Sequence, residues 1–581
     1  MRATFAGLNT MVRGIMANQL SLDTTGHNIT NAGTEGYSRQ VVTLATTYAE
    51  QRPSVHGTVM VGTGVDALAV NRARDVYADI QYRNENPNQQ YYKTLSVNYD
   101  KLETIFDDSQ NLGIEESINK FYQTWVDLST TASNSASRTQ VIEQGRELSD
   151  RIQSATAELQ EQIRSEYEDI AAELKQVDDL LEEITTYNNQ VLTQEVSGAQ
   201  ANDLRDRRDY AVDQLSNYLN ISVTENSFGA YQINSGGVTL VNGPTRAHLV
   251  MSEGVSSEVY GIDYGVTDYN IKVKESNIVF IPQSGTLKAR LDAIRENKDY
   301  IDKMADMSSF LLSTFNDQHR QGWDLDGHSK TENGEAVPDT INFFGQTGLN
   351  YQYRYDPDTK FNYLYRYDSD NANNGELLSG VQIINALEVN VKFSENRGDR
   401  YLAAATSKQY VETGANAGTW QNMEWGNRTG DGTNAVYMSE LFNIPMETVL
   451  SDDKANAIVY GQSYLRDKEG NYIDEDGNVV TDPTKYVYAT SMSKLSINSY
   501  YQQSMSYLGI NSYSVDVNYE AMENIMTQIQ NWRDSMAGVD WNEELTNMIK
   551  FQKGFGSCSR CLNAMDECLD RLVNSTGVVG R

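Results

Sequence analysis

A long stretch without helix breakers constrains this chain more than any other feature. Between about Ser137 and Leu219 there is almost no Gly or Pro, although the 581-residue chain has 41 Gly. Apolar residues recur there at heptad spacing with mixed charges outside, which predicts long packed helices. Fifty such residues would span roughly 75 Å, so the sequence predicts a rod rather than a pocket scaffold. The seam residues are Ile163, Ile170, Leu174, Val177, Leu181, Ile184 and Val191.

Two segments with a different residue pattern interrupt the predicted rod. Short β-branched runs broken by Gly and Asn follow Asn220, and the helical period returns from Leu287 to Phe315. The chain is then turn-rich until helix returns near Ser493. We therefore expect an α+β multidomain protein, a rod of long α-helices with β-rich outer domains inserted in the middle of the chain. Its units are a rod over 66–220 completed by 285–322 and 489–535, a β-rich segment over 221–284, and a β-rich outer domain over 323–488.

Both chain ends are predicted to be amphipathic helices. Apolar residues step by three and four from the start to about Asn31, and again over the last turns of the chain. Neither end has an internal partner except the other, so 1–65 is expected to pair with 536–581 as a coiled coil and to pack against neighbouring copies. The packing residues are Leu8, Val12, Ile15 and Leu22, with Leu562, Met565, Leu569 and Leu572.

A polar, Gly-punctuated stretch from Ser21 to Gln40, "SLDTTGHNITNAGTEGYSRQ", covers the end of the first helix and the loop after it. Gly33 stands where a left-handed C-cap would end that helix. His27 has only Asp23 and hydroxyls nearby in sequence, too few partners for catalysis. The amides of Asn28 and Asn31 could satisfy backbone groups of a neighbouring chain, while a plain helix cap followed by a loop explains the residues equally well.

A second charged motif, "NDLRDRRDYAVDQLSNYL", begins at Asn202. Asn202 could cap a helix, and Asp203 with Arg207 and Arg205 with Asp209 stand at i, i+4. A capped surface helix with ion pairs along it explains most of this motif. That interpretation does not explain why so many charged residues lie between a helix and a β-rich segment.

Composition excludes several kinds of partner. Lys plus Arg number 47 against 80 Asp plus Glu, a formal charge of −33, so nucleic acid and anionic membrane surfaces would be repelled. No stretch approaches the roughly 18 apolar residues of a membrane span, and the first twenty residues lack a signal-peptide core. No H-E-x-x-H, G-x-S-x-G, Walker loop or G-x-G-x-x-G occurs, so we expect no enzyme activity and no cofactor.

Metal sites are weakly suggested at two kinds of position. Cys558, Cys561 and Cys568 lack the fourth ligand that zinc requires, and small apolar packing explains them better. "DLDG" at 324–327 and "DEDG" at 474–477 lack an EF-hand pattern and are expected to be turns. The two "YRYD" repeats, at 353–356 and 365–368, predict an aromatic hairpin, and "DKEGNYIDEDGNVVTDP" predicts an acidic one.

Several motifs in order resemble one family of bacterial flagellar axial proteins. "TTGHNITNAGTEGYSRQ" is similar to the Asn-rich, Gly-punctuated segment that follows the first helix throughout that group. Within the group, "GTGVDALAVNRARDVY", "NDLRDRRDYAVDQLSNYLNISV", "GTLKARLDAIR" and "FNDQHRQGWDLDG" resemble the hook-associated protein 1 family. Glu35 stands where the family commonly has Pro. Gly554 and Gly556 stand inside the closing helix, each costing about 1 kcal/mol against Ala.

The resemblance implies a structural adaptor between hook and filament, exported from the cytoplasm without a cleaved signal peptide and assembled outside the cell. It implies as partners copies of itself, hook protein, the second hook-associated protein and an export chaperone on the C-terminal segment. Asn28, Asn31, Gly36, Tyr37 and Arg39 would position the chain against neighbouring subunits. The alternatives are another axial component, namely hook protein or the second hook-associated protein, and an axial protein whose outer domain is an adhesin or a hydrolase.

Overall fold

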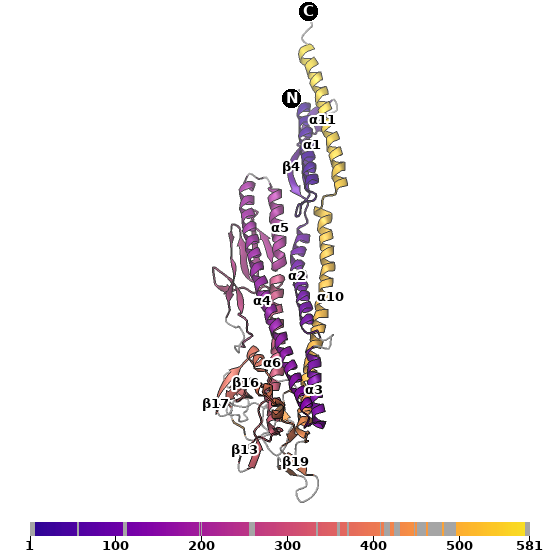
Figure 1. The fold of residues 1–581 in the computed structure, drawn as a ribbon. Helices are drawn as coiled ribbons and strands as arrows, with labels where there is room; N and C mark the ends of the chain where they lie inside the picture. The colour runs from indigo at the N-terminus through magenta and orange to yellow at the C-terminus, as the bar shows by residue number, and fades with distance from the viewer. Residues whose placement is uncertain are drawn as a thin grey trace, which may run out of the picture.

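The protein is an elongated rod with both chain ends at the same end (Figure 1). Long helices run along its length, and short strands and helices are gathered at the far end and on one edge. Within the described ranges, no helix combines the length and the hydropathy that crossing a membrane requires. The computed structural model describes residues 6–575 apart from 55–56, 108–112, 197, 199, 255–261, 333–334, 357–360, 369–370, 407, 412–418, 423–429, 447, 450–460, 463–478 and 481–494.

Helices far apart in sequence form the shaft. α10 packs along α2, α2 also contacts α5 and α6, and α4 packs on α5 and α6. α4 is 61 residues long, about 90 Å of helix. All seven seam residues predicted in it are buried, so that prediction is confirmed. The helices are α2 (Val76–Ile105), α3 (Ile114–Thr130), α4 (Ser135–Glu195), α5 (Asn202–Tyr218), α6 (Thr286–Phe310) and α10 (Ile497–Ala537).

Two small antiparallel sheets fill the first interruption of the rod. One has the order β5-β6-β7-β8 and the other β11-β10-β9, and both lie against α4. Lys298 of α6 is buried and binds Asp268 at 2.7 Å. The strands are β5 (Ser222–Glu225), β6 (Tyr231–Ser235), β7 (Val238–Asn242), β8 (Thr245–Arg246), β9 (Leu249–Glu253), β10 (Tyr269–Val273) and β11 (Ile278–Val279).

The far end of the rod is built around aromatic side chains. Phe121 and Trp125 of α3 contact Phe315, Phe343 and other rings at centroid distances of 5.5–5.9 Å. α6 continues through one π-helical turn into α7, which brings Phe315 into this cluster. The elements are η1 (Leu311–Phe315), α7 (Asn316–Gln321), β12 (Gly322–Trp323), β13 (Ser329–Glu332), β14 (Glu335–Pro338), β15 (Leu349–Asp356), β16 (Phe361–Asp368), β17 (Asn371–Leu378), α8 (Val381–Ala386), η2 (Val391–Ser394), η3 (Gly398–Tyr401), β18 (Ala405–Thr406), β19 (Lys408–Val411), β20 (Thr419–Asn422), α9 (Thr433–Glu440), η5 (Leu441–Asn443), β21 (Thr448–Val449) and β22 (Gly461–Gln462).

The smaller predictions for this end have mixed outcomes. β15 and β16 pair from Leu349 with Asp368 to Asp356 with Phe361, so the "YRYD" repeats do form a hairpin. "DLDG" is a turn, in which Asp324 binds His328 and Gly327 has a φ of 70°. "DEDG" and most of the acidic hairpin lie outside the described residues. The outer region was expected to be β-rich, and it also contains the helices α8 and α9.

The two chain ends form a narrower body beyond the shaft, the axial end. α1 lies alongside α11, and a pair of two-stranded sheets, β1 with β4 and β2 with β3, extends beside them (Figure 1). The α+β multidomain class, with terminal helices paired and β-rich parts inserted in the middle, is thereby confirmed. The elements are α1 (Ala6–Thr30), β1 (Gln40–Thr46), β2 (Glu50–Ser54), β3 (Gly57–Val61), β4 (Val65–Arg72) and α11 (Trp541–Ser575).

Candidate functional site

The polar loop after α1 lies where the axial end meets the shaft. Its left-handed glycine is Gly36, with a φ of 75°, and not Gly33 as the sequence suggested. A Cβ added at Gly36 would lie 2.7 Å from the Cβ of Tyr210 in α5. The Tyr210 hydroxyl donates to Glu35 at 2.7 Å, so Glu35 is itself fixed to α5.

Asn28 ties this loop to both terminal helices. Its side chain is 1% exposed. Its Nδ2 donates to the carbonyl of Gln40 at 2.9 Å and to Glu544 at 3.2 Å. Its Oδ1 accepts from the Gln40 N–H at 2.9 Å and from the Tyr37 hydroxyl at 2.7 Å. The amide was expected to face a neighbouring chain, but it makes these contacts within its own chain.

Arg39 binds the start of α11. Its Nε donates to Glu544 at 2.8 Å and its Nη2 to Glu543 at 2.6 Å, while its backbone N–H donates to the carbonyl of Ala537 at 2.9 Å. Glu544 is only 2% exposed, so Arg39 and Asn28 compensate a buried carboxylate. The chain between α10 and α11 is therefore held to the loop after α1.

Beneath the loop, buried charges join four segments of the chain. Three aspartates stand on one face of α5, and arginines come from β4, the turn after it, α2 and α10. Four positive and four negative groups take part, so the group is neutral as a whole. We call it the arginine–aspartate cluster: Arg72, Arg74, Arg83, Arg533, Asp79, Asp206, Asp209 and Asp213.

Asp209 lies at the centre of the cluster. Arg72 approaches one of its oxygens to 2.7 Å, Arg74 to 3.1 Å, and Arg83 approaches the other to 3.2 Å. The hydroxyl of Tyr231, in β6, donates to it at 2.6 Å. Burial would raise the pKa of Asp209, but the three arginines hold that pKa well below its ordinary value.

The rest of the cluster connects the helices. Arg533 of α10 bridges Asp79 of α2 at 3.0 Å and Asp213 of α5 at 2.5 Å. Asp206 accepts the Ser38 N–H of the loop at 3.0 Å, and burial raises the pKa of Asp206 against the opposing effect of Arg72. Because every member binds a group on another element, the cluster fixes the axial end on the shaft.

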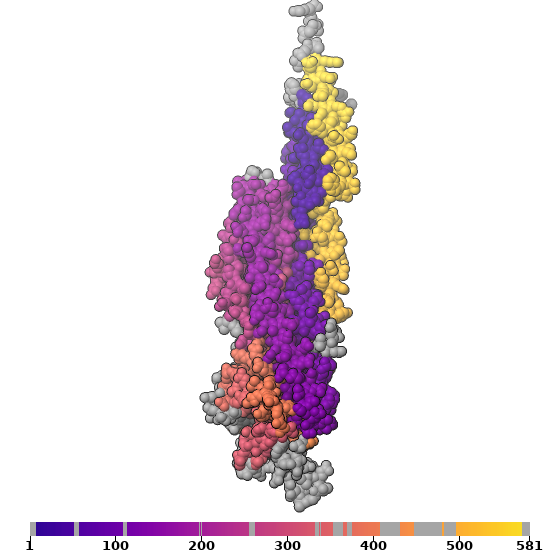
Figure 2. Space-filling view, in the orientation of Figure 1, coloured from indigo at the N-terminus to yellow at the C-terminus, as the bar shows by residue number. Residues whose placement is uncertain are grey.

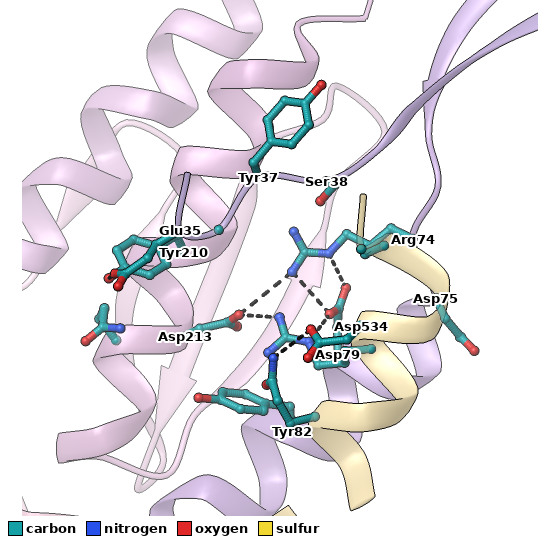
Figure 3. A pocket seen from close by; sticks show the side chains of 16 residues that line it. Glu35, Tyr37, Ser38, Arg74, Asp75, Asp79, Tyr82, Tyr210, Asp213 and Asp534 are labelled. Atoms are coloured by element: carbon teal, nitrogen blue, oxygen red, sulfur yellow. Dashed lines mark hydrogen bonds and ion pairs between the residues drawn. The ribbon is translucent and has the colours of Figure 1, made fainter. Parts of the chain in front are cut away.

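A cleft of about 350 Å³ opens beside the cluster, between α2, α5, α10 and the loop (Figure 3). Asp79, Asp213 and Arg74 form one wall, and the ring of Tyr37 points away from these ion pairs. Burial and the nearby carboxylates of Asp203, Asp206 and Glu544 raise the pKa of Tyr37 above its ordinary value. The geometry is that of a rigid joint, in which the charged groups form ion pairs with one another.

Comparisons with known proteins bear on the whole chain. A family model described as "Flagellar hook-associated protein FlgK helical domain" matches residues 99–333. Flagellar hook-associated protein 1 of Bacillus subtilis is 24% identical over 611 residues, covering 100% of each chain. The protein of that name from Escherichia coli is 22% identical, covering 98% of this chain and 99% of its own. Over almost its whole length the chain is similar to flagellar hook-associated protein 1 of both bacteria.

A solved structure shares the fold. The flagellar hook junction protein FlgK from Burkholderia pseudomallei superposes with a TM-score of 0.54 at 12% sequence identity. The match covers 79% of this chain and 100% of that one.

The α5 motif is not a surface helix with internal ion pairs. Asn202 does not cap α5, since Ala201 is the N-cap, and the Asn202 amide donates to the Val70 carbonyl at 2.8 Å. Asp209 binds β4 and α2 rather than Arg205, which binds Glu195 at 2.7 Å. The motif therefore docks α5 against other elements, which is why it lies between a helix and a β-rich segment.

The remaining residues of the motif lie at its edge. Asp203 accepts from the Gln40 amide at 2.8 Å and lies 3.3 Å from His27, not against Arg207. The Arg207 side chain is exposed and reaches Tyr187 of α4. Asn31 donates to the His27 carbonyl at 3.0 Å and closes the end of α1 locally.

Small residues form the contact between α1 and α11. Cβ atoms added at Gly7 and Gly14 would lie 3.1 Å from Met565 and 3.0 Å from the Cys558 sulfur. On the other helix, one added at Gly554 would collide with Asn18. The two helices are antiparallel. Gly554 is unfavourable for an isolated helix, but here it permits the close approach of α1.

A single copy covers the predicted packing residues only in part. On α1, Leu8, Val12, Ile15 and Leu22 are half-buried. On α11, Leu562 and Leu569 are half-buried and Met565 is 36% exposed. Leu572 lies in α11, but its side chain is outside the described part.

The cysteines show no metal geometry in the described part of the chain. Cys558 packs beside Gly14, whereas Cys561 and Cys568 are exposed on α11. Across the described residues no group of three or more His, Cys, Asp or Glu side chains is placed to hold a metal ion.

Most of the arginine–aspartate cluster could not be predicted from the sequence. The segment "NRARDVYADIQYR" supplies Arg72, Arg74, Asp79 and Arg83, but its local pattern gives no sign that these charges are buried together. The available signal was the spacing of Asp206, Asp209 and Asp213, which places three acids on one helix face. Nothing local pointed to Arg533, which is 320 residues from Asp213.

Proposed function

We propose that this chain is a structural subunit of the bacterial flagellum that joins hook to filament by packing through its axial end. The observation that carries the proposal is the apolar surface that one copy leaves exposed there. On α11, Trp541 is 54% exposed and Ile549 59%, and on α1 Met16 is 65% exposed. Leu44 and Leu68 extend this surface onto β1 and β4. Apolar patches of this kind mark interaction sites.

Relatives named as hook-associated proteins align over almost the whole chain, which supports the same role here. Its partners would be other copies of the chain, hook protein and the second hook-associated protein, with an export chaperone on the C-terminal segment before assembly. The half-buried Leu8, Val12, Ile15, Leu22, Leu562 and Leu569 would be covered by neighbours. We propose no catalytic activity, since the family is structural.

Removal of residues 1–40 tests the role of the axial end. The shaft has its own buried core, so the shortened chain should remain folded but should no longer join hook to filament. Motility and electron microscopy of flagella carrying labelled protein at the hook–filament boundary measure this. Normal assembly by the shortened chain would overturn the proposal.

A point variant tests the same idea with less disturbance. Gly14→Val places branched carbon against Cys558 and should separate α1 from α11 and abolish junction assembly. Gly26→Val in the same helix is the matched control, because an added Cβ there meets nothing within 4 Å. Equal assembly by the two variants would show that the helix pair is not needed.

A further inference from the structure

Three buried amide side chains from three helices meet inside the shaft. Asn98 comes from α2, Gln162 from α4 and Asn297 from α6, and they are 2%, 7% and 0% exposed. α2 and α4 lie side by side along the shaft in Figure 2, and both contact α6. We call these three side chains the amide layer.

The amide layer interrupts apolar seams. In α2, Asn98 stands between Leu95 and Leu102, which are both buried. In α6, Asn297 has the same spacing, with one buried isoleucine three residues before it and another four residues after it. An apolar side chain would continue the seam at each of these positions.

The three amides bind one another but are not fully satisfied. The Gln162 Nε2 donates to the Asn98 Oδ1 at 2.5 Å, and the Asn297 Nδ2 donates to the same oxygen at 3.5 Å. Among the described residues, the Asn98 Nδ2, the Gln162 Oε1 and the Asn297 Oδ1 have no hydrogen-bond partner. A partly satisfied polar group stabilises a core less than an apolar side chain of similar size would. The layer therefore needs an explanation other than stability.

An apolar seam alone does not determine which turns of neighbouring helices face each other. In α4, buried β-branched residues recur every seven positions from Ile163 to Val191. A shift of α4 by seven residues, about 10 Å along its axis, would again place apolar side chains against apolar side chains. The same shift would take Gln162 away from Asn98 and leave buried amides without each other.

The ion pairs next to the layer do not exclude such a shift. Arg290 of α6 binds Glu166 at 2.7 Å and Glu173 at 2.8 Å. These two carboxylates of α4 are seven residues apart, so one would take the place of the other after the shift. The amide layer has no such repeat.

We propose that the amide layer sets the register of α2, α4 and α6, because every alignment that separates its members leaves buried amides unpaired. Single buried polar residues set the register of apolar seams in coiled coils in the same way. The device lies within one copy of the chain and does not depend on the proposed function.

Spin labels on neighbouring helices test the register. In a full chain with its three cysteines changed to Ser, labels are attached at Asp100→Cys of α2 and Ser165→Cys of α4, which are exposed positions. Pulsed electron resonance then gives the distances between the labels. We expect one distance in this parent. The triple variant Asn98→Leu, Gln162→Leu and Asn297→Leu should give at least two, separated by up to about 10 Å.

Two further variants make the test specific. Asn98→Leu alone leaves Gln162 and Asn297 buried without their shared acceptor, so its urea midpoint should lie below that of the triple variant. Lys101→Met removes the neighbouring ion pair with Glu166 and leaves the amide layer intact, so the single distance should remain.

Three results would overturn the proposal. The parent's single distance in the triple variant would show that other contacts set the register. Two distances in Lys101→Met would assign the register to that ion pair. A triple variant that is less stable than Asn98→Leu, or that has no cooperative urea transition, would show that the amides hold the shaft together rather than align its helices.

Discussion

At the scale of single residues, Gly36 shows how a short loop can depend on one missing side chain. Its φ is positive and its Cα lies against Tyr210, so two separate requirements exclude a Cβ. The identity of this residue therefore follows from the packing of α5 as much as from the turn.

Gly36→Ala should lower the free energy of unfolding by about 2 kcal/mol, from backbone strain and the clash with Tyr210. Gly33→Ala is the control, because its φ is ordinary and an added Cβ meets nothing within 4 Å. Urea unfolding of both variants measures the difference. Equal stability would mean that the loop moves away from α5 at little cost.

His319 is a buried base in the aromatic end of the shaft. Its Nδ1 faces the Ile341 carbonyl at 2.8 Å, and its Nε2 accepts the Ala403 N–H at 3.0 Å. This pattern needs the neutral ring. Burial, helped by Arg320 and Arg138, lowers the pKa of His319 to about 4.

The unfolded chain binds a proton at His319 near pH 6.5, but the folded chain does so only near pH 4. Stability should therefore fall as pH drops through this window, by up to about 3 kcal/mol from this residue. Urea unfolding at several pH values, compared with His319→Gln, isolates the effect from carboxylates. Parallel curves for the two proteins between pH 6.5 and 4 would contradict the prediction.

At the scale of elements, α5 is held by buried charges as well as by its apolar face. Asp209→Asn would leave Arg72, Arg74 and Arg83 short of a buried partner, and should destabilise the chain by about 3–5 kcal/mol. Asp203→Asn, on the same helix but with a 60% exposed side chain, should change stability by less than about 1 kcal/mol. Urea unfolding of both proteins tests this, and similar losses would show that burial of the charge is not what matters.

The elements also show where reading the sequence succeeds. Long helices with regular apolar spacing, such as α4, follow from local pattern because one buried face determines them. The pairing of α1 with α11 also followed from the pattern, but the close approach at Gly7, Gly14 and Gly554 did not, since glycines carry no apolar signal. The arginine–aspartate cluster could not be predicted for another reason. A charged residue is expected to be exposed to solvent unless its partner, here on a distant segment, is known.

At the scale of the whole molecule, the formal charge of −33 opposes association. Apolar contacts at the axial end must overcome this repulsion, which salt screens over about 8 Å at 0.15 M. Association of the full chain should therefore be stronger at 300 mM than at 20 mM NaCl, as measured by analytical ultracentrifugation. Weaker association in salt would indicate that ion pairs, and not apolar contacts, dominate.

The antiparallel pairing of α1 with α11 has a consequence for how the chain reaches its native state. Asn28 and Glu544 are 516 residues apart, so this contact has nearly the largest sequence separation that the chain allows. Such a contact forms late, because closing a long loop costs entropy before it returns any stability. A chain that stops before Trp541 cannot form the pair at all. Closure of the axial end therefore requires α11, and a truncated chain leaves α1 unpaired.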